Sequence, residues 1–387
     1  MIKLVCIYKS VVMLVLLLLT SQLYAQNQQS PGNNADHHTD HNDDVVVSNM
    51  DISYQLFNEK QNTGWALYFD NDVLLPGGTT DRDYTGGFSF TLSGVRSTDY
   101  LLSIDGWRNA VTDFLNLSGF YRNKSHFNLH SFSFGMTLFT PADISVSEPV
   151  DGDHPYASFF YITNSQQVVV PQEDIVYISN LSVGFLGLKL AEVVQTQIHE
   201  WTDSIEPMGW DNQISAGGEL TAKYSFGVQK IISRTQAAQY ARHELKLTSE
   251  ANIGFITNAS VGFNWRWGRL TTPWWSFVPH LSDYINMGVP VVRSTASTAR
   301  PEFYVWLGGN YQLHVYNAIL QGQFRDSEVT FSNDQLERYN AEISMGVVRE
   351  FTDRIRVSLF YRHRSAAVKL AGAPDPTWGG VTVSKSF

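Results

Sequence analysis

The sequence predicts an all-β fold, namely an antiparallel transmembrane β-barrel of about 12 strands with a short helix in an extracellular loop. Apolar and polar residues alternate in segment after segment, as in 131–138, where every second residue is apolar. After the first two dozen positions no run of 18 or more apolar residues occurs, which excludes a helical membrane protein. The chain of 387 residues has 10 Trp, 18 Tyr and 23 Phe, as in barrels with aromatic girdles at both membrane interfaces.

The N-terminus has the features of a secretory signal. Lys3 and Lys9 precede an apolar core at 11–19, and Ala25 offers a small residue for cleavage. An uncleaved anchor is disfavoured because this core is short. We therefore expect a signal peptide at 1–25, a polar, disordered tail at 26–60 and an outer-membrane barrel at 61–387. The tail holds a run of His and Asp at 36–44, a composition that could bind a metal but more often stays solvated.

Charge and cysteine content exclude several classes of function. The chain has 27 Lys and Arg against 37 Asp and Glu, a net charge of −10, which argues against nucleic-acid binding. An acidic balance is compatible with divalent cations as partners. The single cysteine, Cys6, lies inside the expected signal, so disulfides and thiol catalysis are excluded from the mature chain.

Segments of period two predict twelve strands. They lie near 64–75, 84–95, 126–139, 156–169, 174–187, 213–228, 238–252, 257–268, 302–316, 336–350, 354–366 and 377–387. A soluble β-sandwich alternates in the same way, but the expected signal, the number of segments and the aromatic content favour the membrane. The last segment ends on Phe387, as expected of the closing strand of an outer-membrane barrel.

An even strand count puts both ends of the barrel sequence on the periplasmic side, so the odd-numbered connections face outward. The outward connections are then about 76–83, 140–155, 188–212, 253–256, 317–335 and 367–376. Two inward connections, 96–125 and 269–301, are long for periplasmic turns. We expect Trp107–Leu117 to form a small amphipathic helix at the membrane interface. A barrel of this size is filled mostly by side chains, which argues against a general porin.

Strand counting brings several polar side chains to one outward rim. Asn71 and Asp72 end the first strand, and Thr85 begins the second. In the third outward connection we expect a helix at Leu190–Asp203, on which Gln195 and His199 share one face. Considered alone, these two residues are more typical of an interfacial histidine beside a solvated glutamine than of a catalytic pair.

Other catalytic patterns are missing from the sequence. It has no Gly-x-Ser-x-Gly nucleophile elbow, and His199-Glu200 is not followed by the second histidine of a zinc-protease motif. What remains is a group of carboxylate and amide oxygens near a lone histidine. Hard oxygen ligands of this kind suit Ca²⁺.

Six short motifs, occurring in this order, resemble those of the lipid A 3′-O-deacylases of the Gram-negative outer membrane. They are Asn71-Asp72, Thr80–Gly87, Phe139–Ile144, Asp153–Ala157, Gln195 with His199, and Gly209–Gln213. The resemblance covers most of 62–387 and implies a twelve-stranded barrel with its active site between the outer rim and a loop helix.

The resemblance also implies roles for individual residues. Asp72, Asn71 and Thr85 would surround a calcium ion, and Asn71 and Thr85 would also serve the reaction. His199 would be the general base, with Gln195 as its neighbour in the catalytic pair.

We therefore expect a calcium-dependent esterase that removes the 3′-linked acyloxyacyl group of lipid A with a water activated by His199. Its partners would be lipid A or lipopolysaccharide in the outer leaflet, its active site would face outward, and it would be a monomer. Two alternatives remain, a non-catalytic structural or binding barrel and a phospholipase acting on glycerophospholipids.

Position 154 departs from the family pattern, because His154 stands where the family has arginine. The 140–155 connection holds four acidic residues and no Lys or Arg, and the nearest basic residues are Arg82 and Lys189. The lack of basic residues argues against recognition of a phosphorylated head group more than against the ester chemistry, so a dephosphorylated lipid A or another acylated lipid remains an alternative substrate.

Overall fold

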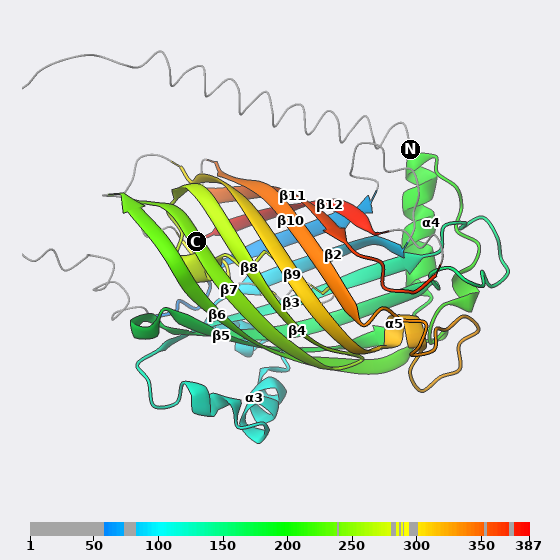
Figure 1. Ribbon diagram of the computed structural model, residues 1–387, viewed down its shortest axis with the longest axis horizontal. Helices are drawn as coiled ribbons and strands as arrows, with labels where there is room; N and C mark the ends of the chain where they lie inside the picture. The colour runs from blue at the N-terminus through cyan, green and yellow to red at the C-terminus, as the bar shows by residue number, and fades with distance from the viewer. Residues whose placement is uncertain are drawn as a thin grey trace, which may run out of the picture.

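Twelve antiparallel strands form a closed barrel in the computed structural model (Figure 1). The structure describes residues 58–72, 83–237, 240–279, 284–285, 288, 290–293, 301–351, 354–370 and 375–387. Each strand pairs with its neighbours in sequence, and β1 closes the barrel on β12. The predicted fold class and strand number are therefore confirmed. The expected signal at 1–25 and most of the expected tail at 26–60 lie outside the described residues.

The strands follow the predicted segments closely, with one exception. They are β1 (Gly64–Asn71), β2 (Asp83–Ser93), β3 (Phe127–Thr140), β4 (Ala157–Val170), β5 (Ile175–Leu186), β6 (Glu219–Ala237), β7 (Tyr240–Gly254), β8 (Ile256–Leu270), β9 (Phe303–Asn317), β10 (Tyr339–Glu350), β11 (Ile355–Arg364) and β12 (Thr377–Ser386). The helices are α3 (Asp105–Phe114), α4 (Leu190–Thr202) and α5 (Ala318–Gln321). Short 3-10 turns are η2 (Val95–Thr98), η3 (Leu117–Phe120), η4 (Pro171–Glu173), η5 (Trp210–Asn212) and η6 (Trp274–Ser276).

The exception is β6, which was predicted at 213–228 and is observed at Glu219–Ala237. Three residues before it have positive φ angles, 54° at Ser215, 89° at Gly217 and 90° at Gly218. Extended strands need negative φ, so the chain turns here and the strand begins only at Glu219. Together with β7 it forms a long hairpin that projects beyond the neighbouring strands (Figure 1).

The barrel wall has the polarity of a membrane protein. Its outside exposes large apolar side chains, among them Phe69, Phe134, Leu247, Val261 and Ile343. Its inside buries hydroxyls, amides and paired charges, because successive side chains of a strand point to opposite faces. An apolar outer band around a polar lumen is the arrangement that a lipid surrounding requires. Within the described residues, no helix is both long and apolar enough to span a membrane.

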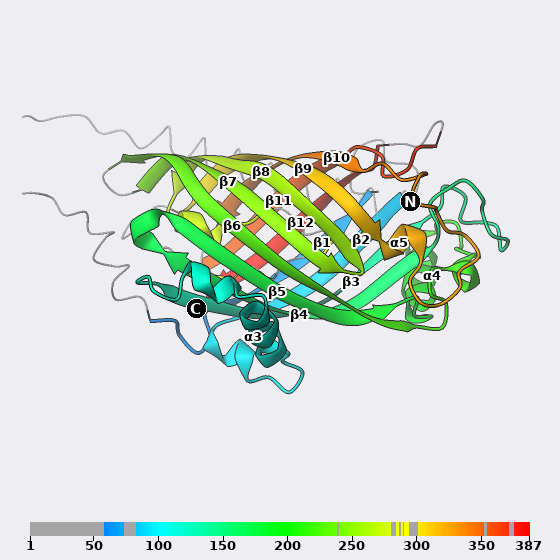
Figure 2. The same cartoon turned by 60° about the horizontal axis from the view of Figure 1, so that its bottom comes forward.

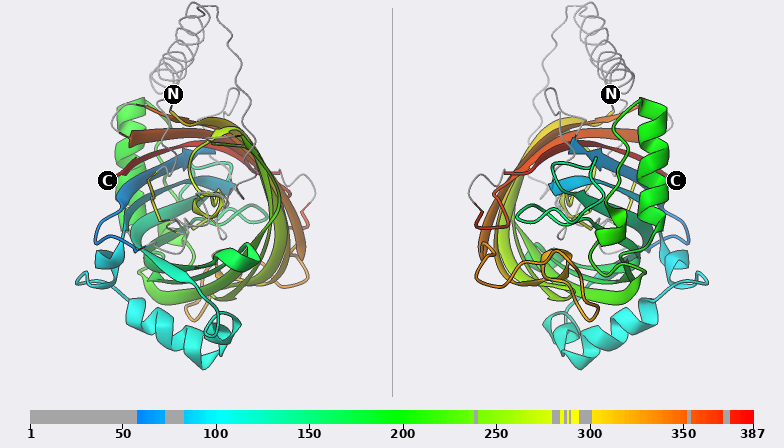
Figure 3. Two further views of the ribbon diagram at one scale, coloured as in Figure 1. Left: turned by 90° about the vertical axis from the view of Figure 1, so that its left-hand side faces the viewer. Right: turned by 90° about the vertical axis from the view of Figure 1, so that its right-hand side faces the viewer.

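The connection between β8 and β9 occupies the lumen (Figure 3). Near the end of the barrel where this connection begins, Trp274 and Trp275 pack against Val176 on the inner wall. Further along the chain, Tyr284 stacks on Tyr84 at the opposite end, with ring centroids 4.7 Å apart. The length of the 269–301 connection, unexplained by the sequence, therefore has a structural reason, since its described part runs through the barrel as an internal plug.

The two ends of the barrel carry different elements. α4 and α5 lie at one end, which we name the α4 end, whereas the C-terminus lies at the other (Figures 1 and 2). α3 lies outside the wall against β4 and β5 (Figures 2 and 3). The helix predicted at Trp107–Leu117 is thus present, although it starts two residues earlier and ends three residues earlier than expected.

Candidate active site

The end of β1 separates two polar neighbours onto opposite faces of the wall. Asp70 points into the barrel, where Tyr68 and Tyr84 donate hydrogen bonds to its carboxylate at 2.6 and 2.8 Å. Asn71 therefore points outward, and its amide nitrogen donates to the main-chain oxygen of Thr85 at 2.7 Å. Asp72 follows directly and is buried. Asp70 thus belongs to the lumen, and Asn71 belongs to the outer face.

Thr85 is the extra residue of a β-bulge in β2. Tyr84 pairs with Phe139 and Gly86 pairs with Leu138, so Thr85 has no paired residue on β3. A bulge of this kind redirects one side chain next to a functional site. Whereas the Tyr84 ring lies in the lumen, the Thr85 hydroxyl lies 2.7 Å from the hydroxyl of Thr140, at the end of β3. The bulge therefore brings Thr85 to the side of the wall on which Asn71 lies.

α4 covers the same part of the wall. Its buried residues Ala191, Gln195, His199 and Thr202 recur every three or four positions and so form one face of the helix. Ala191 packs in a cluster that includes Leu138 of β3. Leu138 pairs with Gly86, beside Thr85, and points outward as Asn71 does. The buried face of α4 and the Asn71–Thr85 pair therefore lie on the same side of the wall at the α4 end.

The helix predicted at Leu190–Asp203 is confirmed, and so is the common face of Gln195 and His199. On the other side of the helix Val193, Ile198 and Trp201 are exposed, Trp201 to 74%. α4 thus presents large apolar side chains on its exposed side, where Gln197 and Glu200 also lie, as expected of a helix at a lipid interface.

A main-chain carbonyl fixes the tautomer of His199. Nδ1 of the imidazole forms a hydrogen bond with the carbonyl oxygen of Ile205. A carbonyl oxygen only accepts, so Nδ1 carries the proton and Nε2 carries the lone pair of the neutral ring. The imidazole is 7% exposed and lies in the last turn of α4. In the neutral ring of His199, Nε2 is therefore the nitrogen that can accept a proton.

The indole of Trp210 orients the side chain of Gln195. Trp210 Nε1 donates to Gln195 Oε1 at 2.8 Å, which turns the amide nitrogen to the other side. That nitrogen is buried and has no hydrogen-bond partner among the described residues. A buried amide donor in this state is suited to an acceptor that arrives with the substrate. The sequence identified the Gly209–Gln213 motif but gave Trp210 no role, and it gave none to Thr140.

The donor set of Asn71, Asp72 and Thr85 agrees in chemistry with a calcium site. It offers one carboxylate, an amide oxygen and a hydroxyl, all hard oxygen ligands. The amide nitrogen of Asn71 is held by Thr85, so the amide oxygen points the other way. Calcium takes about 6–8 oxygens, so main-chain oxygens, water or substrate would have to supply the rest. Within the described ranges no three His, Cys, Asp or Glu side chains form a metal cluster.

His154 lies buried near this rim as a neutral ring. It stacks on Phe139 with centroids 5.2 Å apart, and its Nδ1 lies 2.7 Å from the Pro155 carbonyl oxygen. Burial lowers the pKa of His154 to about 4. Lys189 forms an exposed ion pair with Asp211 at 3.0 Å, and Arg82 lies outside the described residues. The position of the family arginine therefore holds no positive charge at neutral pH.

Comparisons with known proteins agree with this architecture. A family model described as outer membrane protein LpxR matches residues 12–387. Among solved structures, LpxR from Salmonella typhimurium superposes with a TM-score of 0.63 at 15% identity, covering 84% of this chain and 100% of that one. An outer membrane channel from Pseudomonas putida F1 gives a TM-score of 0.41 at 8% identity, covering 86% and 98%. No curated protein sequence matches the chain.

Proposed function

Since the chain belongs to the outer membrane protein LpxR family, we propose that it is an esterase that removes the 3′-linked acyloxyacyl group of lipid A. The observation that carries this proposal is the fixed tautomer of His199, whose Nδ1 is bonded to a carbonyl oxygen. A buried imidazole with a defined basic nitrogen is what general-base hydrolysis needs.

In the proposed reaction, His199 Nε2 takes a proton from a water molecule, and the resulting hydroxide adds to the ester carbonyl carbon. The tetrahedral intermediate then expels the sugar oxygen, which takes the proton back from His199, and the fatty acid leaves. The amide nitrogen of Gln195 donates to the oxyanion or to the attacking water, since Trp210 occupies its oxygen. No covalent acyl-enzyme forms on this route.

We propose that Asp72, Asn71 and Thr85 hold the calcium ion, with Asp72 contributing the negative charge. When bound, calcium would polarise the ester carbonyl and stabilise negative charge on its oxygen. The hydrogen bonds from Asn71 to Thr85 and between Thr85 and Thr140 hold the Asn71 amide and the Thr85 hydroxyl in place before any ion arrives. The exposed apolar side of α4, including Trp201, contacts the acyl layer in which the substrate lies.

In this proposal the α4 end faces outward, toward lipid A in the outer leaflet. The neutral His154 and the acidic 141–156 connection offer little attraction to phosphate groups. We therefore propose that phosphates are not needed for recognition and that dephosphorylated lipid A is cleaved at least as well as the phosphorylated form.

The experiment is mass spectrometry of lipid A after incubation with detergent-refolded protein and calcium. Wild type is compared with His199→Ala and with His243→Ala, which removes an imidazole near the opposite end of the barrel. Loss of one acyloxyacyl mass with wild type and His243→Ala, but not with His199→Ala, supports the proposal. Unchanged lipid A with cleaved glycerophospholipids makes the protein a phospholipase. If both lipids stay intact, the barrel is non-catalytic.

A further inference from the structure

The segment that contains α3 exposes apolar side chains and buries polar ones, the reverse of a helix in a water-soluble protein. Its large apolar side chains are exposed, Leu101 to 99%, Phe114 to 88% and Trp107 to 68%. Its polar side chains Asp105 and Arg108 are buried against the wall. In water this arrangement is unfavourable, because apolar surface is exposed while a charge pair is desolvated. Surrounded by hydrocarbon, the same arrangement is favourable, so the segment is suited to lipid.

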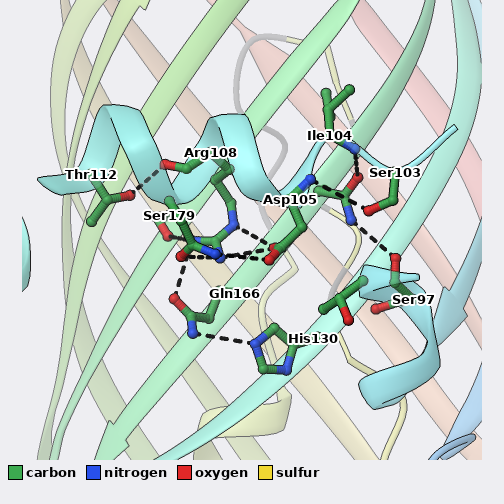
Figure 4. A network of polar contacts seen from close by, with 12 residues as sticks. Ser97, Ser103, Ile104, Asp105, Arg108, Thr112, His130, Gln166 and Ser179 are labelled. Atoms are coloured by element: carbon green, nitrogen blue, oxygen red, sulfur yellow. Dashed lines mark hydrogen bonds and ion pairs between the residues drawn. The ribbon is translucent and has the colours of Figure 1, made fainter. Parts of the chain in front are cut away.

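A polar network on the outer side of the wall holds α3 in this position (Figure 4). The Arg108 guanidinium donates to Asp105 at 2.9 Å, to Gln166 of β4 at 3.1 Å and to Ser179 of β5 at 2.6 Å. Gln166 and Ser179 pair across the two strands and point outward. Without α3 both polar groups would face hydrocarbon without the Arg108 guanidinium as a partner, which is unfavourable.

Further contacts extend the network along the helix. The Ile104 N–H donates to the Asn164 side chain at 2.8 Å, and the hydroxyls of Thr112 and Tyr224 lie 2.8 Å apart. Together with Arg108 these contacts tie α3 to three adjacent strands, β4, β5 and β6. α3 is thus a fixed part of the outer wall, and its position relative to β5 and β6 is defined.

An apolar groove lies between α3 and the α4 end of the wall. Its volume is about 900 Å³, within the range of sites that hold a small organic ligand. Trp107 and Val111 of α3 line one end, and Phe324, from the connection after β9, lines the other. Between them the lining continues over Leu220 and Ala222, on the outer side of β6. The groove is therefore continuous with the lipid-facing wall and follows the direction from the rim into the bilayer.

We propose that this groove binds one fatty acyl chain of a lipid in the leaflet at the α4 end of the barrel. The lipid head group lies at the rim beside Phe324, and the chain runs past Ala222 to end beside Val111 and Trp107. The occupant is an acyl chain because the lining is apolar and the groove opens to the bilayer. The occupant belongs to this leaflet because α3 closes the groove at its deeper end. This site is separate from the one that contains His199 and does not depend on the catalytic proposal.

The test is photolabelling of the refolded full chain in phosphatidylcholine vesicles that contain a small fraction of diazirine phosphatidylglycerol. One probe carries the diazirine at the chain end, and the other carries it next to the ester. We expect the chain-end probe to label the peptide with Val111 and the ester-proximal probe to label the peptide with Phe324. Displacing about two methylene groups weakens binding roughly tenfold, so Ala222→Trp is expected to reduce both labels about tenfold.

Ala259→Trp is the matched control, since Ala259 is exposed on the outer side of β8 and does not line the groove. It is expected to leave the labelling unchanged. Ala110 is exposed on α3 and lines the opposite side of the groove. Ala110→Trp therefore fills the groove from that side, and it serves as the second variant if Ala222→Trp does not fold. Labelling spread evenly over lipid-facing peptides, labelling insensitive to both groove variants, or an inverted depth order of the two probes would each overturn the proposal.

Discussion

Lowering the pH is expected to destabilise the barrel through His154. The ring is buried against Phe139, and burial is the main reason that its pKa falls to about 4. The Pro155 carbonyl and the Asp153 carboxylate act in the opposite direction with smaller effect. In the unfolded chain the same ring titrates near 6.5. Between these two values the unfolded chain binds a proton that the folded chain excludes, so stability is full above about 6.5 and is lost as the pH falls toward 4.

The magnitude follows from the difference between the two pKa values. A difference of about 2.5 units corresponds to roughly 3 kcal/mol of unfolding free energy. About half of this loss is expected near pH 5, and the loss levels off as the pH falls through about 4.

The assay is urea unfolding of the refolded barrel in detergent micelles, followed by tryptophan fluorescence at several pH values. His154→Phe is the comparison, because phenylalanine keeps the stacking on Phe139 and cannot bind a proton. Titrating carboxylates affect both proteins alike and cancel in the difference. Between pH 7 and pH 4, wild type should lose about 3 kcal/mol more than the variant. Parallel pH profiles for the two proteins would refute the reasoning.

Three further predictions concern the site and the lumen. Trp210→Phe removes the donor that orients Gln195, so turnover of lipid A is expected to fall about tenfold with little change in unfolding free energy. Asp72→Asn removes the charge of the proposed calcium site, so the calcium concentration for half-maximal activity should rise at least about tenfold. Glu342→Gln leaves the guanidiniums of Arg362 and Arg364 buried without their carboxylate, which is expected to cost about 3–5 kcal/mol in urea unfolding.

Each of these predictions has an outcome that contradicts it. Full activity of Trp210→Phe would mean that the amide of Gln195 needs no orientation. An unchanged calcium requirement in Asp72→Asn would remove this carboxylate from the calcium site, and wild-type activity in the presence of a chelator would remove calcium altogether. Wild-type stability of Glu342→Gln would show that water or other side chains satisfy the two arginines.

Period-two alternation was sufficient to predict most of the barrel. In 131–138 the apolar residues point to the outer face of the wall and the small polar ones point to the lumen, so the pattern reports the two faces of one strand directly. It failed at 213–218, where the residues preceding β6 are compatible with a strand but three of them adopt positive φ. Alternation carries no information about backbone turns of that kind.

The internal plug could not be predicted, because its position depends on contacts with strands far away in the sequence. The aromatic residues at 274–277 are as suitable for a membrane interface as for a lumen. Their packing is determined by the inner wall of the barrel. Leu129 and Val176 lie near Trp275, and Tyr304 lies near Phe277. The orientation of α3 was missed for the same reason, since its polar face is satisfied by Gln166 and Ser179 of the barrel wall.

For the site, the sequence predicted which residues share the α4 end but not how they are oriented. Strand counting was enough to place Asn71, Asp72 and Thr85 at the α4 end. Helical spacing was enough to place Gln195 and His199 on one face of a helix. The bulge at Thr85, the carbonyl of Ile205 and the indole of Trp210 are tertiary features that no spacing rule contains. Trp210 and Thr140 lie inside motifs that the sequence did indicate, so the signal was present without an assignable role.

The most direct test of the central claim is tandem mass spectrometry of lipid A treated with the refolded wild-type protein in the presence of calcium. We predict a product that has lost one acyloxyacyl group, with the fragments placing the loss at the 3′ position alone. Intact lipid A, or loss of an acyl chain from any other position, would contradict the account.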